Sequence, residues 1–309
     1  MTDSLKKISD FFKEKYFVMI FVLCLLGAGI KNVITFKRMN LPYLQIGAAL
    51  VLFATLLLVI FFFAKKVSVS ISTKFLVTAL VLGSIYMFVI PVDAVPDEHT
   101  HYLRTYSVAN EILRLKPEDG KLLMREVDAV ADNKTKYESK NEYNEYFCKF
   151  KNEFFTGKSE YKGYKIGLMK GYSLPYVVPA IGMIIGRILN LGYISCYMMA
   201  RLFNLIFFVI VMTYAVKKIP VFKEGLFAIG LLPIVMQQGM SLSYDVMLIA
   251  CTTASFSLLL KGYCEVETMS RLDWVLFGVF SFSVIPLKGY AYVLIGIQPL
   301  VLMTYRMIK

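Results

Sequence analysis

Long apolar runs separated by short polar or basic segments make up most of the chain. Most of the runs are roughly 17–23 residues long, the length with which an α-helix crosses a hydrocarbon layer. The first run is long and lacks a small-residue cleavage site, so we expect a retained helix and not a signal peptide. The runs predict about eight transmembrane helices: Tyr16–Thr35, Tyr43–Ala64, Lys74–Pro91, Ile194–Val216, Glu224–Met240, Ser243–Lys261, Asp273–Pro286 and Gly289–Tyr305.

A ninth apolar stretch, Tyr172–Leu189, decides the topology. It carries Pro175, Pro179, Gly182 and Gly186, and residues of this kind weaken a spanning helix. If the stretch does not span and the N-terminus is cytoplasmic, most lysines and arginines of the short loops lie on the cytoplasmic side, as is typical of membrane proteins. If the stretch spans, the lysines and arginines that follow it lie on the extracytoplasmic side instead. We therefore expect the stretch to lie in, or dip into, the outer leaflet, with both termini cytoplasmic.

This topology predicts an all-α polytopic membrane protein in three segments. They are an N-terminal three-helix membrane segment (1–91), an extracytoplasmic loop with juxtamembrane helices (92–193) and a C-terminal five-helix membrane segment (194–309). Within the loop, residues 116–170 are rich in Lys, Glu, Asn and Tyr. We expect them to form a solvated cap of short helices and turns without strands.

The composition supports a membrane protein. Hydrophobic residues make up 57% of the chain and charged residues 18%, with a mean hydropathy of +0.60. A soluble domain is closer to half apolar and a quarter charged, so disordered, collagen-like and coiled-coil classes are excluded. Of the five cysteines only Cys148 lies in the long polar loop, so neither a disulfide framework nor a Cys-x-x-Cys metal site is expected.

The net charge of +12 raises the question of a nucleic-acid partner. Residues 92–171 contain 14 basic and 14 acidic side chains, which cancel. The other 20 basic and 8 acidic residues lie in or between the apolar runs and account for the whole excess. Basic residues beside membrane spans are typical of cytoplasmic loops, so we expect a lipid bilayer and no nucleic acid as partner.

The predicted topology brings three polar segments to the same face of the membrane. Asp93–His101 follows the third span, Ser241–Asp245 lies at the outer turn between the fifth and sixth spans, and Ile285–Tyr290 lies between the seventh and eighth. Because these turns carry acids, histidines and a lysine, their meeting point is the candidate site.

Asp97 and Glu98 directly follow Pro96, a residue favoured in the first turn of a helix. If Glu98–Leu115 is helical, then Asp97, His101 and Arg104 recur at i, i+4 and i+7. A carboxylate there could accept a proton from a hydroxyl, and Arg104 could bind a phosphate. The alternative is that both acids are ordinary helix-capping residues.

His99 and His101 are the only histidines, and both lie beside carboxylates. A metal held by both rings is disfavoured, because a His-x-His pair places them on different helix faces and no further ligand cluster completes the set. No metal ligand is therefore assigned. A divalent cation, Mg²⁺ or Mn²⁺, held by carboxylates during turnover is left open.

Charged residues at membrane depth are costly and are usually functional or paired. Asp245 lies at the rim of an apolar hairpin, so it either serves a site or pairs with a nearby base. Lys288 departs from the cytoplasmic bias of the other lysines, which indicates an anion site, or else it reaches a lipid phosphate. Arg201 and Asn204 form a predicted buried polar pair about two turns below the outer surface.

Three stretches together carry a family pattern. They are Pro96-Asp-Glu-x-x-His101, then Leu174-Pro-Tyr-x-x-Pro179-Ala-x-Gly182 through Gly186-Arg187 and Arg201-x-x-Asn204, then Leu232-Pro233 through Ser241-x-Ser-Tyr-Asp245. The set resembles the bacterial predicted-membrane-protein family known as domain of unknown function 2142, which is placed in the GT-C glycosyltransferase superfamily. The resemblance covers roughly residues 75–305, and Lys288-Gly-Tyr290 matches a later Lys-x-x-Tyr element only loosely.

The resemblance implies a GT-C-like helical bundle in the bacterial plasma membrane. It implies an inverting transfer of a sugar from a polyprenyl-phosphate donor to a cell-envelope glycan at the extracytoplasmic face. Asp97 would be the general base, and Glu98 would assist it or bind a metal. Asp245 would orient acceptor or donor, and Lys288 or Arg201 would bind the departing phosphate. The expected substrate-binding residues are His101, Arg104, Arg201, Tyr244, Asp245 and Lys288.

Two other functions fit a polytopic membrane protein. A transporter or flippase of a lipid-linked sugar would favour charges at mid-membrane depth and broken helices in two matching halves. Here Arg201 is the clear interior charge and no repeat is visible. The other alternative is a non-catalytic membrane scaffold of an envelope-glycan assembly.

Overall fold

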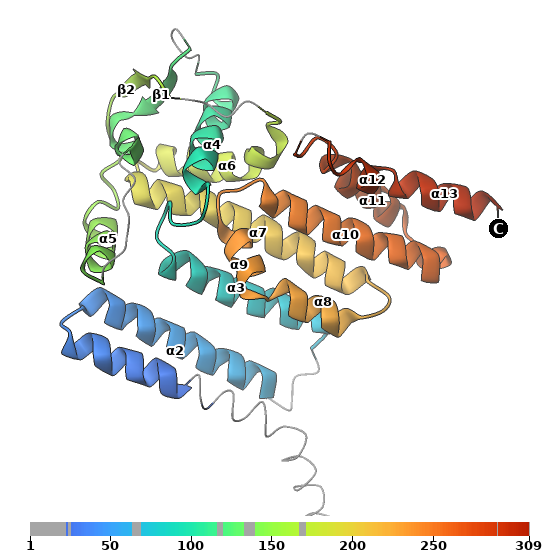
Figure 1. Cartoon of the computed structure of the whole chain (residues 1–309), viewed down its shortest axis with the longest axis horizontal. Coiled ribbons are helices and arrows are strands. Elements are labelled where there is room, and N and C mark those ends of the chain that lie inside the picture. Colours follow the sequence, from blue (N-terminus) through green and yellow to red (C-terminus); the bar gives the residue numbers. More distant parts are fainter. Residues whose placement is uncertain are drawn as a thin grey trace, which may run out of the picture. The chain divides into compact units, whose positions relative to one another are not determined.

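The computed structural model describes residues 23, 26–63, 69–115, 120–132, 140–166, 171–288 and 290–308, most of which are helical (Figure 1). Residues 26–38 are helical. The helices and strands that follow are α2 (Pro42–Phe63), α3 (Ile71–Val89), α4 (Glu98–Ile112), β1 (Leu122–Arg125), the 3₁₀ helix η1 (Glu126–Asp132), α5 (Lys140–Asn152), β2 (Tyr161–Tyr164), α6 (Leu174–Ile188), α7 (Tyr193–Lys218), α8 (Lys223–Gly230), α9 (Pro233–Met240), α10 (Asp245–Cys264), η2 (Val266–Thr268), α11 (Arg271–Ser283), α12 (Val293–Gly296) and α13 (Gln298–Ile308).

The described residues divide into two compact units. One comprises those within Met1–Ser68 and Glu138–Cys148 and includes α2, which lies where the second span was expected. The other comprises those within Val69–Tyr137 and Lys149–Lys309 and contains the candidate site. The first expected span lies largely outside the described residues. The three-segment division of the chain at residues 91 and 193 stays a prediction.

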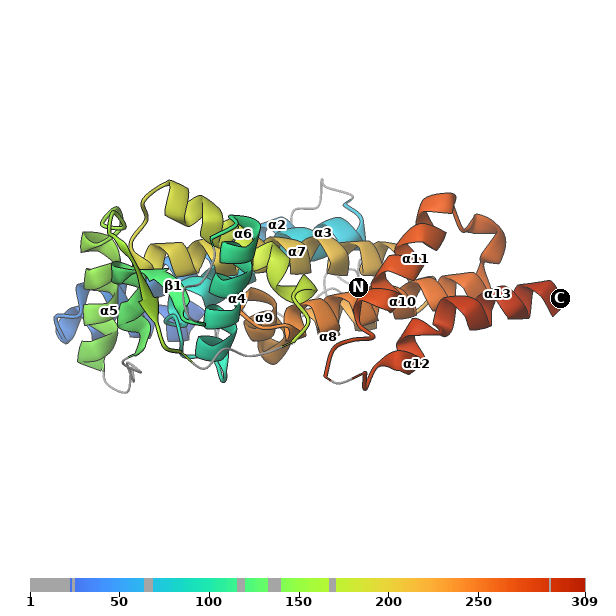
Figure 2. The same ribbon diagram turned by 90° about the horizontal axis from the view of Figure 1, so that it is seen from above.

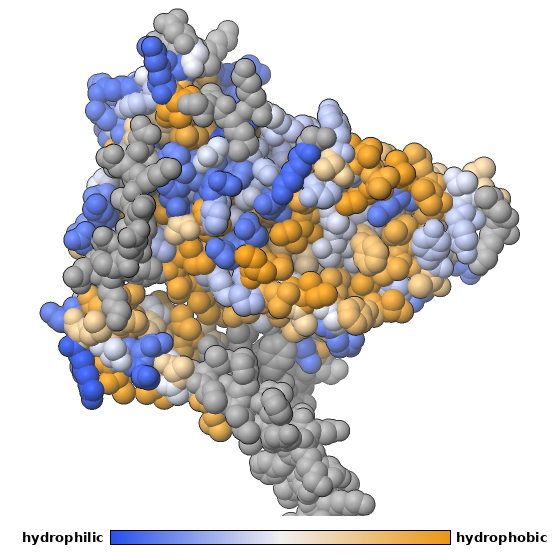
Figure 3. Space-filling model, viewed as in Figure 1, coloured by the Kyte–Doolittle hydropathy of each residue, from blue (hydrophilic) through white to orange (hydrophobic). Residues whose placement is uncertain are grey.

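Among the helices of the described residues, α3, α7 and α10 are long and apolar enough to cross a membrane. They coincide with the expected spans Lys74–Pro91, Ile194–Val216 and Ser243–Lys261. α7 packs against both α3 and α10, and the axes of the three helices are roughly aligned, with α3 antiparallel to the other two and with α4 and the strands at one end (Figures 1 and 2). In Figure 3 hydrophilic side chains gather mainly over that end, and hydrophobic ones cover much of α10 to α13.

Three other expected spans are not continuous helices. Glu224–Met240 divides into α8 and α9, because Leu232 precedes Pro233 and adopts the extended backbone that proline imposes on its predecessor. The run Asp273–Pro286 gives the 13-residue helix α11 followed by turns. The run Gly289–Tyr305 gives the four-residue α12 and the separate α13. The prediction of eight uninterrupted transmembrane helices is therefore not confirmed.

The long polar loop contains two strands, so the expectation of a cap without strands is wrong. β1 and β2 pair antiparallel, with Leu122 opposite Tyr164. Asn110 of α4 donates from its side chain to the carbonyl of Leu123 at 2.8 Å. Each strand has four residues, and β1 is mostly buried along its length, so no apolar–polar alternation marks it in the sequence.

α6 packs closely against the beginning of α7, and glycine makes the approach feasible. A Cβ atom added at Gly182 would lie 2.5 Å from the carbonyl oxygen of Met199, and one at Gly186 would lie 3.0 Å from the Cys196 Sγ. With 15 residues α6 belongs to the shorter apolar helices. The position of this stretch in the outer leaflet stays a prediction.

Substituting Gly182 by Ala is expected to destabilise the protein by about 1–3 kcal/mol, the usual cost of overpacking. The new methyl group meets rigid backbone, so α6 has to move away from α7. The measurement is the free energy of unfolding in detergent. Gly47→Ala in α2 is the control, because a Cβ there has no neighbour within 4 Å. Equal stability of both variants would contradict the close packing.

Basic residues from two helices meet one carboxylate at the opposite end of α7 and α10 from α4. Asp273, near the start of α11, contacts the Lys218 Nζ at 2.7 Å and the Lys261 Nζ at 2.8 Å. Tyr214 donates its hydroxyl to the same carboxylate at 2.6 Å. The charge pattern places Lys218 and Lys261 on one side of the membrane, and the structure brings them together.

Candidate functional site

Asp97 lies in the turn between α3 and α4, immediately before the first helical residue. α4 covers Glu98–Ile112, close to the expected Glu98–Leu115. The exposed Asp97 side chain makes no capping hydrogen bond, and its backbone is left-handed with a φ of 61°. Asp97 therefore occupies the N-cap position without the side-chain hydrogen bond that a capping acid usually makes.

Left-handed backbone recurs around this site. The φ angles are 66° at Asp93, 61° at Asp97, 49° at Lys288 and 66° at Tyr290. Such conformations are costly for residues with a Cβ atom and tend to cluster where a site imposes them. Two separate turns of the candidate site therefore share this strain.

Glu98, unlike its neighbour, is fully buried against Arg201 of α7. Arg201 donates from Nε to Glu98 Oε1 at 2.8 Å and from Nη2 to Oε2 at 2.5 Å. It also donates to the carbonyls of Ile90 at 2.6 Å and Pro91 at 2.8 Å. Both charged groups are enclosed by protein. The expected roles of Glu98 as a metal ligand or assisting base, and of Arg201 as a phosphate ligand, therefore do not fit this geometry.

The Glu98 carboxylate also orders two backbone turns. Its Oε2 accepts a hydrogen bond from the N–H of Asp93 at 3.1 Å, and its Oε1 accepts one from the N–H of Leu242 at 3.0 Å. Asp93 belongs to the turn before α4, whereas Leu242 belongs to the turn before α10. One carboxylate thus connects turns that are about 150 residues apart in the sequence.

Asn204 reinforces the second turn. It is buried one helical turn after Arg201 and donates to the carbonyl of Ser241 at 2.8 Å. Within the turn the Ser243 hydroxyl accepts from the N–H of Asp245 at 3.0 Å. Burial of Arg201 and Asn204, predicted from the sequence, is confirmed, and each contacts a different partner.

Asp245 and Lys288 lie close together, as expected for two turns predicted on the same face of the membrane. The Lys288 Nζ lies 3.4 Å from Asp245 Oδ1, and 5.4 Å from the ring centroid of Tyr244. Asp245 raises the pKa of Lys288 above its ordinary value. The side chain of Lys288 remains 44% exposed, so its ammonium group is accessible to an anion.

His101 lies between these charges. It is buried, its Nδ1 lies 2.9 Å from the Tyr176 hydroxyl, and its ring contacts the edge of Tyr244 at a centroid distance of 5.1 Å. Burial lowers the pKa of His101, against the opposing influence of Asp245 and Asp97. The imidazole is therefore neutral at pH 7 and positions its neighbours through contacts.

Arg104 connects α4 to the start of α6. Its Nη2 donates to the Ser173 hydroxyl at 2.6 Å and to the carbonyl of Gly171 at 2.9 Å, and its Nη1 contacts Glu111 at 3.2 Å. These contacts occupy both terminal nitrogens. Arg104 therefore serves the packing of α6, and the expected phosphate contact does not fit.

The two histidines have different surroundings. His99 Nδ1 lies 3.4 Å from Asp93 Oδ2, whereas His101 contacts aromatic residues. Among the described residues, no group of three His, Cys, Asp or Glu side chains is arranged to hold a metal ion.

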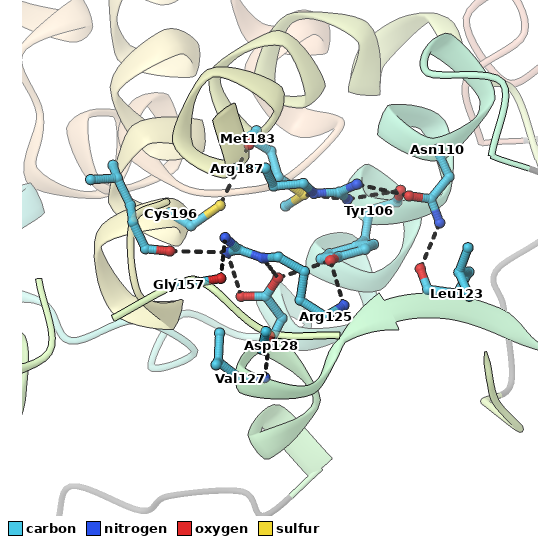
Figure 4. Close-up of polar contacts among 12 residues, drawn as sticks. Tyr106, Asn110, Leu123, Arg125, Val127, Asp128, Gly157, Met183, Arg187 and Cys196 are labelled. Carbon is cyan, nitrogen blue, oxygen red and sulfur yellow. Dashed lines mark hydrogen bonds and ion pairs between the residues drawn. The ribbon is translucent and has the colours of Figure 1, made fainter. Parts of the chain in front are cut away.

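A second buried polar cluster, which the sequence did not reveal, anchors the segment between α4 and α6 (Figure 4). Arg125 donates to both Asp128 oxygens at 2.7 and 2.9 Å, and Tyr106 donates to Asp128 at 2.8 Å. The Arg187 guanidinium lies 3.5 Å above the Tyr106 ring and donates to Asn110 at 2.8 Å. In the sequence these residues look like ordinary charges of a solvated loop, and only the i, i+3 spacing of Arg125 and Asp128 hints at a pair.

Comparison with known proteins gives one family. The model described as predicted membrane protein (DUF2142) matches residues 80–309. No curated protein and no solved structure matches the chain.

Proposed function

Because the chain belongs to this family of predicted membrane proteins, DUF2142, we propose that it is an integral-membrane glycosyltransferase of the GT-C type. It would move a sugar from a polyprenyl-phosphate donor to a hydroxyl of a cell-envelope glycan. The observation that carries the proposal is the contact between Lys288 and Asp245 at the same end of the apolar helices as the exposed Asp97. Asp97, Asp245 and Lys288 all act electrostatically on the ring of His101.

The proposed reaction needs one acid–base group and one cation. The acceptor hydroxyl attacks the anomeric carbon, a new C–O bond forms, and the bond between this carbon and the phosphate oxygen breaks. The hydroxyl proton goes to the Asp97 carboxylate, and the bonding electrons leave with the polyprenyl phosphate. The anomeric configuration inverts, because the attack comes from the face opposite the leaving group.

Lys288 is the group we assign to the leaving phosphate. Negative charge develops on that phosphate as its bond to the sugar breaks, so a cation fixed nearby stabilises the transition state more than the ground state. Asp245 holds the ammonium group in place. Tyr244, whose ring lies against both Lys288 and His101, would contact the donor sugar.

The proposed orientation places this site on the extracytoplasmic side of a bacterial plasma membrane. Lys217 and Lys218 end α7, and Lys261 lies in the last turn of α10. Basic residues at these ends favour the cytoplasm under the positive-inside rule, which puts the Asp97 end outside. A donor in the outer leaflet would then present its phosphate directly to Lys288.

The test uses the purified full chain in proteoliposomes with a radiolabelled polyprenyl-phosphate sugar and a panel of envelope glycans. We expect free polyprenyl phosphate and labelled glycan to appear in equal amounts. Movement of the intact lipid-linked sugar between leaflets without cleavage would identify a flippase. If the donor is neither bound, cleaved nor moved, the transferase and the flippase are both contradicted. The non-catalytic scaffold is then the remaining alternative.

A further inference from the structure

We infer that Glu98 and Arg201 form a positioning pair that sets the geometry between the turn carrying Asp97 and the turn carrying Asp245. Neither residue is a catalytic residue, because both are fully buried and neither can reach substrate. The pair instead acts through the backbone on both sides of it. Its effect on catalysis rests on the proposed function, whereas its effect on the two turns can be measured without any substrate.

The contacts of the pair define what it positions. The guanidinium donates to the carbonyls of Ile90 and Pro91, directly after α3, and the carboxylate accepts from one N–H group in each turn. Asp97 directly precedes Glu98, and Asp245 follows Leu242 by three residues. A shift of the Glu98 carboxylate would therefore be transmitted to the acid on each side of the site.

The pair is rigid enough to hold this geometry. A bidentate Arg–carboxylate contact fixes orientation as well as distance, and burial removes competition from water. Tyr197 adds a contact from its hydroxyl to the carbonyl oxygen of Glu98 at 3.4 Å. Left-handed residues such as Asp93 and Asp97 persist where surrounding contacts over-determine them, and the carboxylate supplies such a contact at Asp93.

The chain contains a matched control for this inference. Arg125 and Asp128 form a second buried bidentate pair, and Arg125 likewise donates to two carbonyls, those of Gly157 and Leu191. This second pair contacts neither of the two turns. The two pairs therefore share burial and charge but differ in what they hold.

The experiment compares Glu98→Gln with Asp128→Asn in the full chain. Amide hydrogen exchange, without substrate, is read at Asp93 and Leu242. We expect Glu98→Gln to accelerate exchange at these two amides by about tenfold or more, because each loses a bond to a charged acceptor. Asp128→Asn should leave both amides slow. In the transferase assay Glu98→Gln should lower kcat by about 100-fold with little change in donor KM, since misplacement by about 1 Å has that effect.

The outcomes separate this inference from the proposed function. Slow exchange at both amides in Glu98→Gln, or equal acceleration in Asp128→Asn, would overturn the positioning pair. Absence of transfer by the wild-type protein would overturn the proposed function and leave the exchange result valid. If Glu98→Gln does not fold, amide exchange in the wild-type chain tests the inference. Fast exchange at Asp93 and Leu242 in the intact protein would contradict it.

Discussion

Replacing Asp97 by asparagine is expected to lower kcat for sugar transfer by about 10²–10⁴-fold, the contribution typical of a general base. Asparagine matches aspartate in shape and tolerates left-handed backbone, so the φ of 61° at this position need not change. The exposed side chain makes no capping bond that the substitution could break. The variant should therefore lose activity with an unchanged unfolding midpoint.

The control for this experiment is Glu111→Gln. Glu111 lies in α4, the helix that follows Asp97. Its side chain is 54% exposed, and it pairs with Arg104 and not with the proposed site. Activity of this variant should stay close to that of the wild type. If Asp97→Asn transfers sugar as fast as Glu111→Gln, then Asp97 is not the general base of the reaction.

The largest loss of stability is expected for Asp128→Ala. This substitution leaves the buried Arg125 guanidinium without its carboxylate, and removal of one partner from a buried ion pair costs about 3–5 kcal/mol. Tyr106 loses the acceptor of its hydroxyl as well. The loss should appear in the free energy of unfolding measured in detergent with chemical denaturant.

Glu126→Ala is the matched comparison for this prediction. Glu126 lies two residues from Asp128 and also contacts a base, Lys162 at 2.8 Å, but both side chains are about half exposed. Exposed pairs are weak because water screens them, so little change in unfolding is expected. A similar effect of both substitutions would show that the buried cluster of Figure 4 does not anchor this segment.

Hydropathy and charge predicted the features that depend on the bilayer. The positions of α3, α7 and α10 follow from apolar length, and the meeting of Asp245 with Lys288 follows from the side assigned to each turn. The helix after Pro96 follows from local chemistry, because proline and acids favour a helix start. The helix positions use one segment at a time, and the side of each turn uses the charges of the short loops.

Features that depend on contacts between segments were missed. Glu98 and Asp97 are adjacent acids with the same local signals, yet one is buried against Arg201 and the other is exposed. Which of them faces inward depends on the left-handed turn at Asp97, and no pattern in the sequence specifies that turn. The break between α8 and α9 was missed for a different reason, since membrane helices often tolerate proline.

In the proposed orientation, the spacing of the ion pairs along α7 determines how deep in the membrane the proposed site would lie. Arg201 and Lys218 are 17 residues apart on one helix, about 25 Å at 1.5 Å per residue. The hydrocarbon layer is about 30 Å thick. With Lys218 at one edge of that layer, Arg201 lies a few ångströms inside the other edge, where the surrounding helices shield it from lipid. In this proposed orientation we expect Asp97 and Lys288 to lie level with the lipid headgroups, so that a donor could react without lifting its phosphate out of the membrane surface.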